Sequence, residues 1–361
     1  IYAKDDDENQ NNRNEIRDLE TTIALLEKCM KDLDNFDVSQ AEFFLQGLFE
    51  SIQEAANVNV ENYVVRGNDG YRDTGMERSI DEIVCYGIGT FFKSSDNMHS
   101  MKRYNPPLIQ LACALVLRNY FAIYRKQINV AMRSGDCDRH DNDKNLATNP
   151  QKLTYQEQQD IVPTYYFEPF IQPLERKVLN HFHVKVLDVN EQGKRRISVK
   201  GQVLPKSSTL FYMPHCPMRL YSNVLWANWN IEGEEDVLMD GRIVIMGNSF
   251  RAYDDRIISS EKKNDKTNAI FPLLPFTQEV KVLASKQGTG NKKKKTIYTG
   301  SVMTNDALSF QEVELSFNDS AIISFSKRDG SLLEVQEDLN LPFPKQPEEY
   351  FVGNDENGEV V

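Results

Sequence analysis

The segment Met-Pro-His-Cys-Pro at residues 213–217 holds the side chains best suited to chemistry. Its two prolines stiffen a short bend, and Pro217 can begin a helix because its missing N–H would have no partner in a first turn. A helix N-terminus lowers the pKa of a thiol, so Cys216 is a candidate reactive group and His215 a candidate acid or base. Neighbouring side chains in a bend point apart, which disfavours a Cys–His pair made from these two. A rigid bend whose imidazole bonds to a loop carbonyl remains an equal interpretation.

A second candidate is the glycine pair that follows the apolar run ending at Tyr86. Gly87 and Gly89 would let the backbone turn tightly, and N–H groups of the following helix could receive an anion. The third glycine of a dinucleotide-binding motif is replaced by Phe92, however. Two glycines that ease a strand out of a crowded sheet explain the pattern equally well.

Polar side chains also follow two other predicted strands. Glu168 could contact a ribose-like hydroxyl or bond a neighbouring backbone N–H. Asn248 and Ser249 could hold a hydroxyl or phosphate group, or could cap a turn. The candidate ligand-binding residues are therefore Gly87, Gly89, Thr90, Glu168, Pro214, His215, Gly247, Asn248 and Ser249.

Strands that alternate with helices are expected to position these loops. Short apolar runs predict strands and periodic runs predict helices. The strands are expected at residues 83–86, 164–167, 184–187, 209–213 and 243–246, and the helices at 107–132, 171–180 and 218–229. Continuous apolar strands imply a Rossmann-like α/β fold with a mostly parallel sheet covered by helices on both faces. Ligands bind beyond the carboxyl ends of such strands, so we expect the four loops along one edge.

The remaining chain is predicted to flank or interrupt this sheet. Residues 1–68 form an acidic tail and a two-helix segment, with helices expected at 14–34 and 38–56. The α/β domain spans 78–327 and ends in edge strands at 272–283 and 313–325. Its polar insertions lie near 133–160, 254–268 and 284–298, and residues 328–361 form an acidic C-terminal tail.

Composition excludes several classes of function. Lys and Arg number 42 against 54 Asp and Glu, and the net charge of −12 disfavours direct contact with nucleic acid or anionic membranes. The longest apolar run, 111–117, is too short to cross a bilayer, so we expect no membrane association.

The cysteines point to a reducing compartment. Five cysteines are an odd number without a repeating framework, which favours free thiols in the cytoplasm and nucleus. The first 18 residues lack the pattern of a signal peptide. Cys137 and His140 have the spacing of two metal ligands, but a closed zinc site needs four, so no metal site is predicted.

Several motifs together resemble the sensitivity-to-red-light-reduced (SRR-like) family from about residue 80 to residue 325. The matching segments are Cys-Tyr-Gly-Ile-Gly at 85–89, Gln-Leu-Ala at 110–112, Phe-Tyr-Met-Pro-His-Cys-Pro at 211–217, Leu-Tyr at 220–221, Asn-Trp at 228–229, Gly-Asn-Ser-Phe at 247–250 and Phe-Asn-Asp-Ser at 317–320. The resemblance implies regulation: of circadian and light signalling in plants, of resistance to the microtubule drug benomyl in fungi, and of haem synthesis in animals. The family typically has Asp-Pro where this chain has Glu168-Pro169.

The sequence therefore supports two alternative hypotheses for the function. The first is a cytoplasmic and nuclear regulatory protein that contacts protein partners and senses a small ligand at the strand ends. The alternative is an enzyme that binds a nucleotide-like cofactor, S-adenosylmethionine or a dinucleotide, at Gly87 and Gly89 with His215 as acid or base. The sequence names neither cofactor nor reaction, and it favours the first function because it shows no catalytic pair. Direct binding to microtubules is disfavoured because tubulin and this chain are both acidic.

Overall fold

The fold is known here from a computed structural model of the chain. It describes residues 2–36, 44–57, 78–92, 104–134, 161–197, 207–229, 237–238, 241–257, 268–283 and 308–326.

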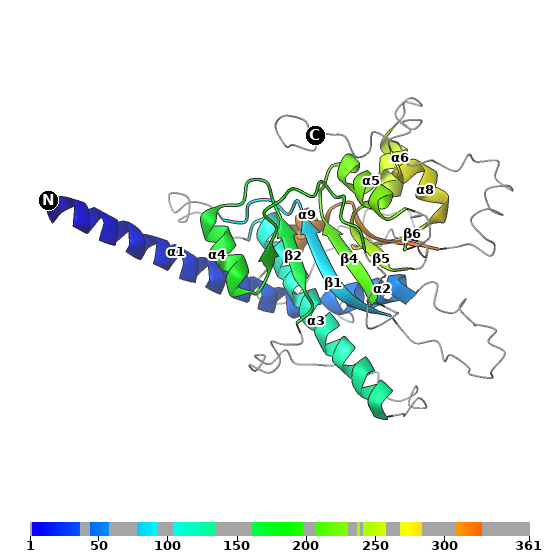
Figure 1. Ribbon diagram of the computed structural model, residues 1–361, viewed down its shortest axis with the longest axis horizontal. Coiled ribbons are helices and arrows are strands. Elements are labelled where there is room, and N and C mark those ends of the chain that lie inside the picture. Colours follow the sequence, from blue (N-terminus) through cyan, green and yellow to red (C-terminus); the bar gives the residue numbers. More distant parts are fainter. Residues whose placement is uncertain are drawn as a thin grey trace, which may run out of the picture.

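A seven-stranded mixed sheet forms the centre of the structure, in the order β3-β2-β1-β4-β5-β7-β6 (Figure 1). The first five strands in that order are parallel, and β7 runs antiparallel to both of its neighbours. The bounds are Ser79–Tyr86 for β1, Thr164–Phe167 for β2, Lys185–Val186 for β3, Ser207–Met213 for β4, Ile243–Asn248 for β5, Thr277–Lys281 for β6 and Ser320–Phe325 for β7. The predicted α/β class with a mostly parallel sheet is confirmed.

Helices cover both faces of the sheet, because the strands carry apolar side chains on both sides. One buried cluster joins the sheet to α1 (Tyr2–Asp34), α2 (Phe44–Asn57), α3 (Pro106–Ser134), α4 (Pro173–His181) and α9 (Phe310–Phe317). A second cluster joins the other face to α5 (Met218–Ala227), α6 (Phe250–Arg256) and α8 (Ile270–Leu273). A 3₁₀ turn, Leu274–Phe276, leads from α8 into β6.

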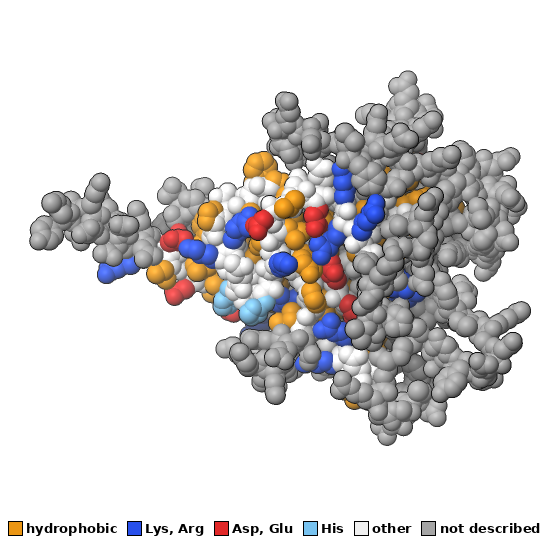
Figure 2. Space-filling model, viewed as in Figure 1, with side chains coloured by type: hydrophobic (Ala, Val, Ile, Leu, Met, Phe, Trp, Pro, Cys, Tyr) orange, Lys and Arg blue, Asp and Glu red, His pale blue; other side chains and the backbone are white. Residues whose placement is uncertain are grey.

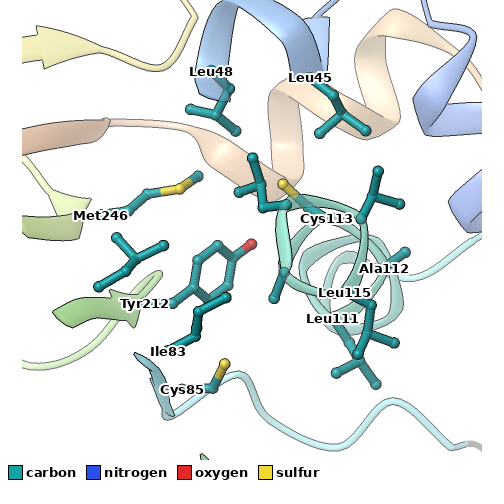
Figure 3. Packing of buried hydrophobic residues seen from close by; sticks show 14 of the residues in the cluster. Leu45, Leu48, Ile83, Cys85, Leu111, Ala112, Cys113, Leu115, Tyr212 and Met246 are labelled. Atoms are coloured by element: carbon teal, nitrogen blue, oxygen red, sulfur yellow. The ribbon is translucent and has the colours of Figure 1, made fainter. Parts of the chain in front are cut away.

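Alternation along the strands assigns each side chain to one of these clusters. Ile83 and Cys85 face the α3 side, whereas Val84 and Tyr86 face the α5 side. Figure 3 shows Tyr212 projecting from the sheet toward α3, near Cys113. The Tyr212 hydroxyl donates to the Gln110 carbonyl at 2.8 Å, which satisfies the polar end of an otherwise buried ring.

The N-terminal helical segment belongs to the same core. Leu26 and Leu33 of α1 are completely buried, and the hydroxyls of Tyr104 and Tyr120 donate to Asp32 and Asp34 at 2.7 and 2.8 Å. The helix begins at Tyr2 instead of near residue 14, so the stretch predicted as a polar tail is helical.

The C-terminal part of the sheet differs from the prediction. Residues 310–317 form α9 where an edge strand was expected from residue 313, because Ser309 and Glu312 make a reciprocal capping box that starts a helix. Similarly, α8 and the 3₁₀ turn occupy the start of the strand predicted from residue 272. Helix α6 continues through residues 254–256, so that predicted insertion starts too early.

Other boundary predictions fall on chain that the structure does not describe. Residues 135–160, 258–267, 284–298 and 328–361, which include most of the predicted insertions and the whole acidic tail, lie outside the described residues.

The strand order creates a switch point beside β1. From β1 the chain crosses to β2 and then β3 on one side, and returns to place β4 on the other side of β1. In open α/β sheets the crevice beyond the carboxyl ends at such a point is where ligands bind. In this chain the residues that follow β1 and β4 are Gly87 and Pro214.

Helix α3 has the length and composition to cross a membrane, from Pro106 to Val130. In the fold, however, 72% of its apolar window is buried. A core helix between a sheet and other helices has the same character.

We predict that α1 contributes to global stability through its buried face. Leu26→Ala should lower the free energy of unfolding by roughly 2–5 kcal/mol, because it leaves a cavity in the core. Ile16→Ala is the matched control on the same helix, since Ile16 is 50% exposed, and it should cost less than about 0.5 kcal/mol. Urea denaturation measures both, and equal effects would contradict the docking of α1.

Candidate functional site

The four predicted loops meet at the carboxyl edge of the sheet. The backbone N–H of His215 donates to Asn248 Oδ1 at 3.1 Å, which joins the loop after β4 to the end of β5. The N–H of Gly89 donates to Glu168 Oε2 at 3.0 Å, which joins the loops after β1 and β2. Cys216 Sγ packs against Gly87 and so connects the two halves. We call these loop residues the His215 rim: Gly87, Gly89, Glu168, His215, Cys216 and Asn248.

Asn248 holds the loop that carries His215. Besides accepting the His215 N–H, its Nδ2 donates to the Cys216 carbonyl at 3.2 Å and to Tyr253 Oη at 2.9 Å. Its backbone N–H donates to Tyr221 Oη at 2.8 Å, and the Tyr221 hydroxyl donates to the Met213 carbonyl. The Asn248 side chain is therefore engaged in positioning backbone. The sequence analysis missed the contributions of Tyr221 and Tyr253, although Tyr221 belongs to one of the matching motifs.

His215 is the exposed side chain that this scaffold presents. Its φ of +58° lies in the left-handed region, which a non-glycine residue adopts at some cost. Nε2 lies 3.1 Å from the Ser316 carbonyl at the end of α9. A carbonyl only accepts, so Nε2 carries a hydrogen and donates it to Ser316, and Nδ1 has no hydrogen-bond partner among the described residues. The interpretation of a rigid bend with a carbonyl-bonded imidazole matches this geometry.

Cys216 is buried, and the expectation of a lowered thiol pKa is wrong. The thiol donates to the Tyr86 carbonyl at 3.2 Å and is 2% exposed. Burial raises the pKa of Cys216 well above its ordinary value, and the nearby Glu168 carboxylate raises it further. Cys216 is a packing residue, not a nucleophile, in this conformation.

The two glycines serve the tight chain path. Gly87 and Gly89 have φ values of +62° and +87°. A Cβ atom at Gly87 would lie 2.8 Å from Cys216 Sγ, closer than Cβ contacts normally allow. The structure therefore supports the interpretation that these glycines ease β1 out of a crowded sheet.

Two carboxylates accept hydrogen bonds from the backbone N–H groups of this glycine loop. Glu168 accepts from Gly89, as described above, and Glu175 Oε1 accepts from the N–H groups of Phe91 and Phe92 at 2.7 and 2.9 Å. Glu175 is 1% exposed, and its other oxygen accepts from the Gln172 N–H at 2.8 Å at the start of α4. Desolvation raises the pKa of Glu175, and the three backbone bonds oppose that rise.

Glu175 was missed by the sequence analysis, but a signal existed. Gln172 followed by Pro173 and by Glu175 three residues on has the spacing of a helix capping box. The second function of that carboxylate, as acceptor for a loop more than eighty residues earlier in the chain, depends on the tertiary fold.

Ser249 caps α6, the helix that follows β5. Its Oγ accepts from the Ala252 N–H at 3.1 Å and donates to Glu279 Oε2 at 2.6 Å. Glu279 Oε1 also accepts from the Arg251 N–H. Gly247 packs against the Tyr221 ring, and Thr90 is exposed at the rim. The described residues contain no cluster of His, Cys, Asp and Glu able to hold a metal ion, and Cys137 and His140 lie outside them.

A family model described as the SRR1 domain matches residues 48–324. The chain belongs to the SRR1 domain family. The match begins within α2 and ends within β7, includes every part of the His215 rim, and confirms the resemblance seen in the motifs.

Three curated relatives agree with this assignment. An SRR1-like protein of Mus musculus is 40% identical over 95 residues, 26% of this chain and 33% of that protein. Protein SENSITIVITY TO RED LIGHT REDUCED 1 of Arabidopsis thaliana is 35% identical over 176 residues, 49% of this chain and 42% of that protein. An SRR1-like protein of Drosophila melanogaster is 30% identical over 93 residues, 26% of this chain. The matches thus span less than half of each relative, and no solved structure matches this SRR1-domain chain.

We predict that Gly87 cannot carry a side chain. Gly87→Ala should cost roughly 1–3 kcal/mol of unfolding free energy, because it combines a left-handed φ with a collision against Cys216 Sγ. Removing the sulfur in Gly87→Ala/Cys216→Ala should relieve only the collision. A double-mutant cycle should therefore show a favourable coupling of at least about 0.5 kcal/mol, and strict additivity would argue against the contact.

We also predict that Cys216 is inert in the folded protein. At about pH 8, alkylation of the Cys216 peptide, followed by mass spectrometry, should be at least about tenfold slower in native than in urea-unfolded protein. Rapid native labelling would contradict the buried site.

The same burial has a consequence for stability against pH. Burial also raises the pKa values of Cys85 and Cys113, each to about 12. A raised folded-state pKa means that stability is complete below the unfolded pKa of about 8.5 and falls as the pH rises above it. The free energy of unfolding should therefore decline above about pH 9. A profile that stays flat to about pH 11 would contradict this expectation.

Proposed function

We propose that this SRR1-domain protein is a regulatory protein that works by binding at the His215 rim. The observation that carries the proposal is the construction around His215: a left-handed backbone, a loop held by Asn248, and a ring oriented by the Ser316 carbonyl while the side chain stays exposed. Strain that the surroundings maintain around an exposed polar group is typical of functional positions.

Binding is favoured over nucleophilic catalysis because the thiol next to His215, that of Cys216, is buried. The Cys216 thiol is directed to the Tyr86 carbonyl and held in its neutral form by burial. A nucleotide-like cofactor is also less favoured, since the N–H groups of Gly89, Phe91 and Phe92 already donate to the carboxylates of Glu168 and Glu175. These contacts support a sensor or partner-binding site more than an active site.

The name of the Arabidopsis thaliana relative refers to sensitivity to red light. On this likeness we propose that this chain also regulates signalling. We propose further that it acts in the cytoplasm and nucleus by binding protein partners. Regulation of circadian timing, haem synthesis or response to microtubule drugs would be particular forms of that role.

The surface is consistent with selective contacts. Figure 2 shows Lys and Arg side chains interspersed with Asp and Glu around a hydrophobic streak on the face drawn. Phe170 and Val189, each three residues beyond the end of β2 and β3, are 64% and 72% exposed. Mixed charge with exposed apolar side chains suits a protein partner better than a polyanion.

We predict that His215→Asn removes binding and leaves the fold intact. Asn tolerates a positive φ, so the loop should keep its conformation while the imidazole is lost. Calorimetry and thermal-shift screening against nucleotides, S-adenosylmethionine and haem should identify a ligand of the wild type. His215→Asn should weaken that ligand at least about tenfold, with an unchanged unfolding midpoint.

Two further variants distinguish the effect of the His215 imidazole from that of the hydrogen bonds that hold its loop. Asn248→Asp should weaken binding and also lower stability, because a carboxylate cannot donate to Cys216 or Tyr253. Val280→Ala, on the exposed face of β6, should change neither property. A wild-type ligand bound with full affinity by His215→Asn would overturn the assignment of the rim.

A further inference from the structure

Strand β6 is an edge of the sheet, and its outer side carries backbone groups without partners (Figure 1). Its inner side pairs with β7: the Val282 N–H donates to the Ser320 carbonyl at 3.0 Å, so Val280, two residues earlier, also directs its N–H and C=O at β7. Glu279 and Lys281 alternate with these residues and direct their N–H and C=O away from β7. Those outward backbone groups have no hydrogen-bond partner among the described residues.

The edge lacks most of the features that prevent strands from pairing. β6 is five residues long, contains no proline and keeps a continuous register with β7. Val280 is 47% exposed and Lys281 is exposed. An exposed edge strand of this kind readily accepts another strand. A lysine on the edge opposes such pairing unless the added strand brings a carboxylate opposite it.

The side chains of β6 provide that carboxylate themselves. Glu279 and Lys281 lie on the face toward α6, where the Glu279 carboxylate bonds the first turn of that helix. Val280 lies on the other face, because its partner Ile322 belongs to the cluster on the α3 side. When two β6 strands pair antiparallel about a twofold axis at Val280, Glu279 of each copy lies opposite Lys281 of the other. The two Val280 side chains then meet at the axis.

Charge favours this register over the adjacent ones. Residues with outward backbone groups must oppose one another, so the axis moves from Val280 to Glu279 or to Lys281 when the register shifts. An axis at either of these residues places two like charges directly opposite each other, which destabilises a sheet. The axis at Val280 instead makes two pairs of opposite charge, and each pair exchanges both backbone hydrogen bonds.

We propose that β6 is a homodimerisation strand, through which two copies of the chain join their sheets about a twofold axis at Val280. Two short edge strands make a small interface, so the dimer is weak and forms only as the protein concentration rises. The net charge of −12 on each copy opposes association, and physiological salt screens that repulsion beyond about 8 Å while the adjacent Glu279–Lys281 pairs remain. This inference is independent of ligand binding at the His215 rim.

Sedimentation velocity of the full chain, at about 0.15 M salt and roughly 1–300 µM protein, tests the proposal. The wild type should shift from monomer toward dimer as its concentration rises. Lys281→Glu places carboxylates opposite each other and should weaken dimerisation at least about tenfold. Lys281→Pro should do the same, because it removes an outward N–H that the pairing with β7 does not use.

Matched variants control for charge and folding. Lys281→Arg should dimerise like the wild type, as should Lys185→Glu, which makes the same change of charge on β3 at the opposite edge. Unfolding midpoints at about 1 µM, where the monomer predominates, should be unchanged for Lys281→Glu because this side chain is exposed. A wild type that stays monomeric at about 300 µM, or a dimer that Lys281→Glu leaves intact, would overturn the proposal.

Disulfide trapping tests the position of the axis. Two Val280→Cys side chains would form a non-hydrogen-bonded pair with Cα atoms about 4.5 Å apart, so oxidised glutathione should link them into a dimer. Gln278→Cys lies on the same face but opposite Val282 of the other copy, so two of these thiols should not meet. Dimers trapped equally well by both variants, or by Gln278→Cys alone, would contradict the axis at Val280. Val280→Ala keeps both charge pairs and should dimerise within about threefold of the wild type.

Discussion

The strand-end loops of this protein satisfy their backbone polar groups with side chains from elsewhere in the chain. Gly89, Phe91, Phe92, His215 and Cys216 all have peptide groups at this edge, and side chains from elsewhere in the chain meet them. An unpaired buried N–H or C=O costs about 1–3 kcal/mol, so the placement of these acceptors and donors constrains everything nearby. The positions of His215 and Glu168 follow from it.

This constraint explains why the Cys216 thiol in the segment 213–217 is buried and neutral, although the segment contains reactive residue types. Asn248 bonds both the N–H before and the C=O after the bend, so the bend turns Cys216 inward and His215 outward. Burial then raises the pKa of the thiol, whereas the imidazole stays exposed with a defined hydrogen-bond direction. The hydrogen bonds of the Asn248 side chain thus hold the bend in which Cys216 is buried and His215 is exposed. In this chain the SRR1 domain presents the His215 imidazole at the surface and buries the neighbouring Cys216 thiol.

Most of the sheet could be predicted from local pattern. The runs at β1, β4 and β5 are continuous and apolar because both sides of those strands are covered, and such runs are recognisable in the sequence. The prediction failed where local signals were mixed. Residues 313–317 have strand-like apolar content, but the capping box at Ser309 starts a helix before them. Asp254 and its neighbours read as an insertion, although the Ser249 cap starts α6 just ahead of them.

The sequence by itself determined which loops would share an edge, because parallel strands place their carboxyl ends together, and it marked the glycines and the His-Cys bend as special. Only the tertiary structure decided what those residues do. The hydrogen bond of the Cys216 thiol, the filling of the glycine loop by Glu175 and the tautomer of His215 each depend on a partner distant along the chain: Tyr86, Phe91 and Ser316 respectively. Burial and hydrogen bonding over such separations are properties of packing, and a local pattern of residue types does not contain them.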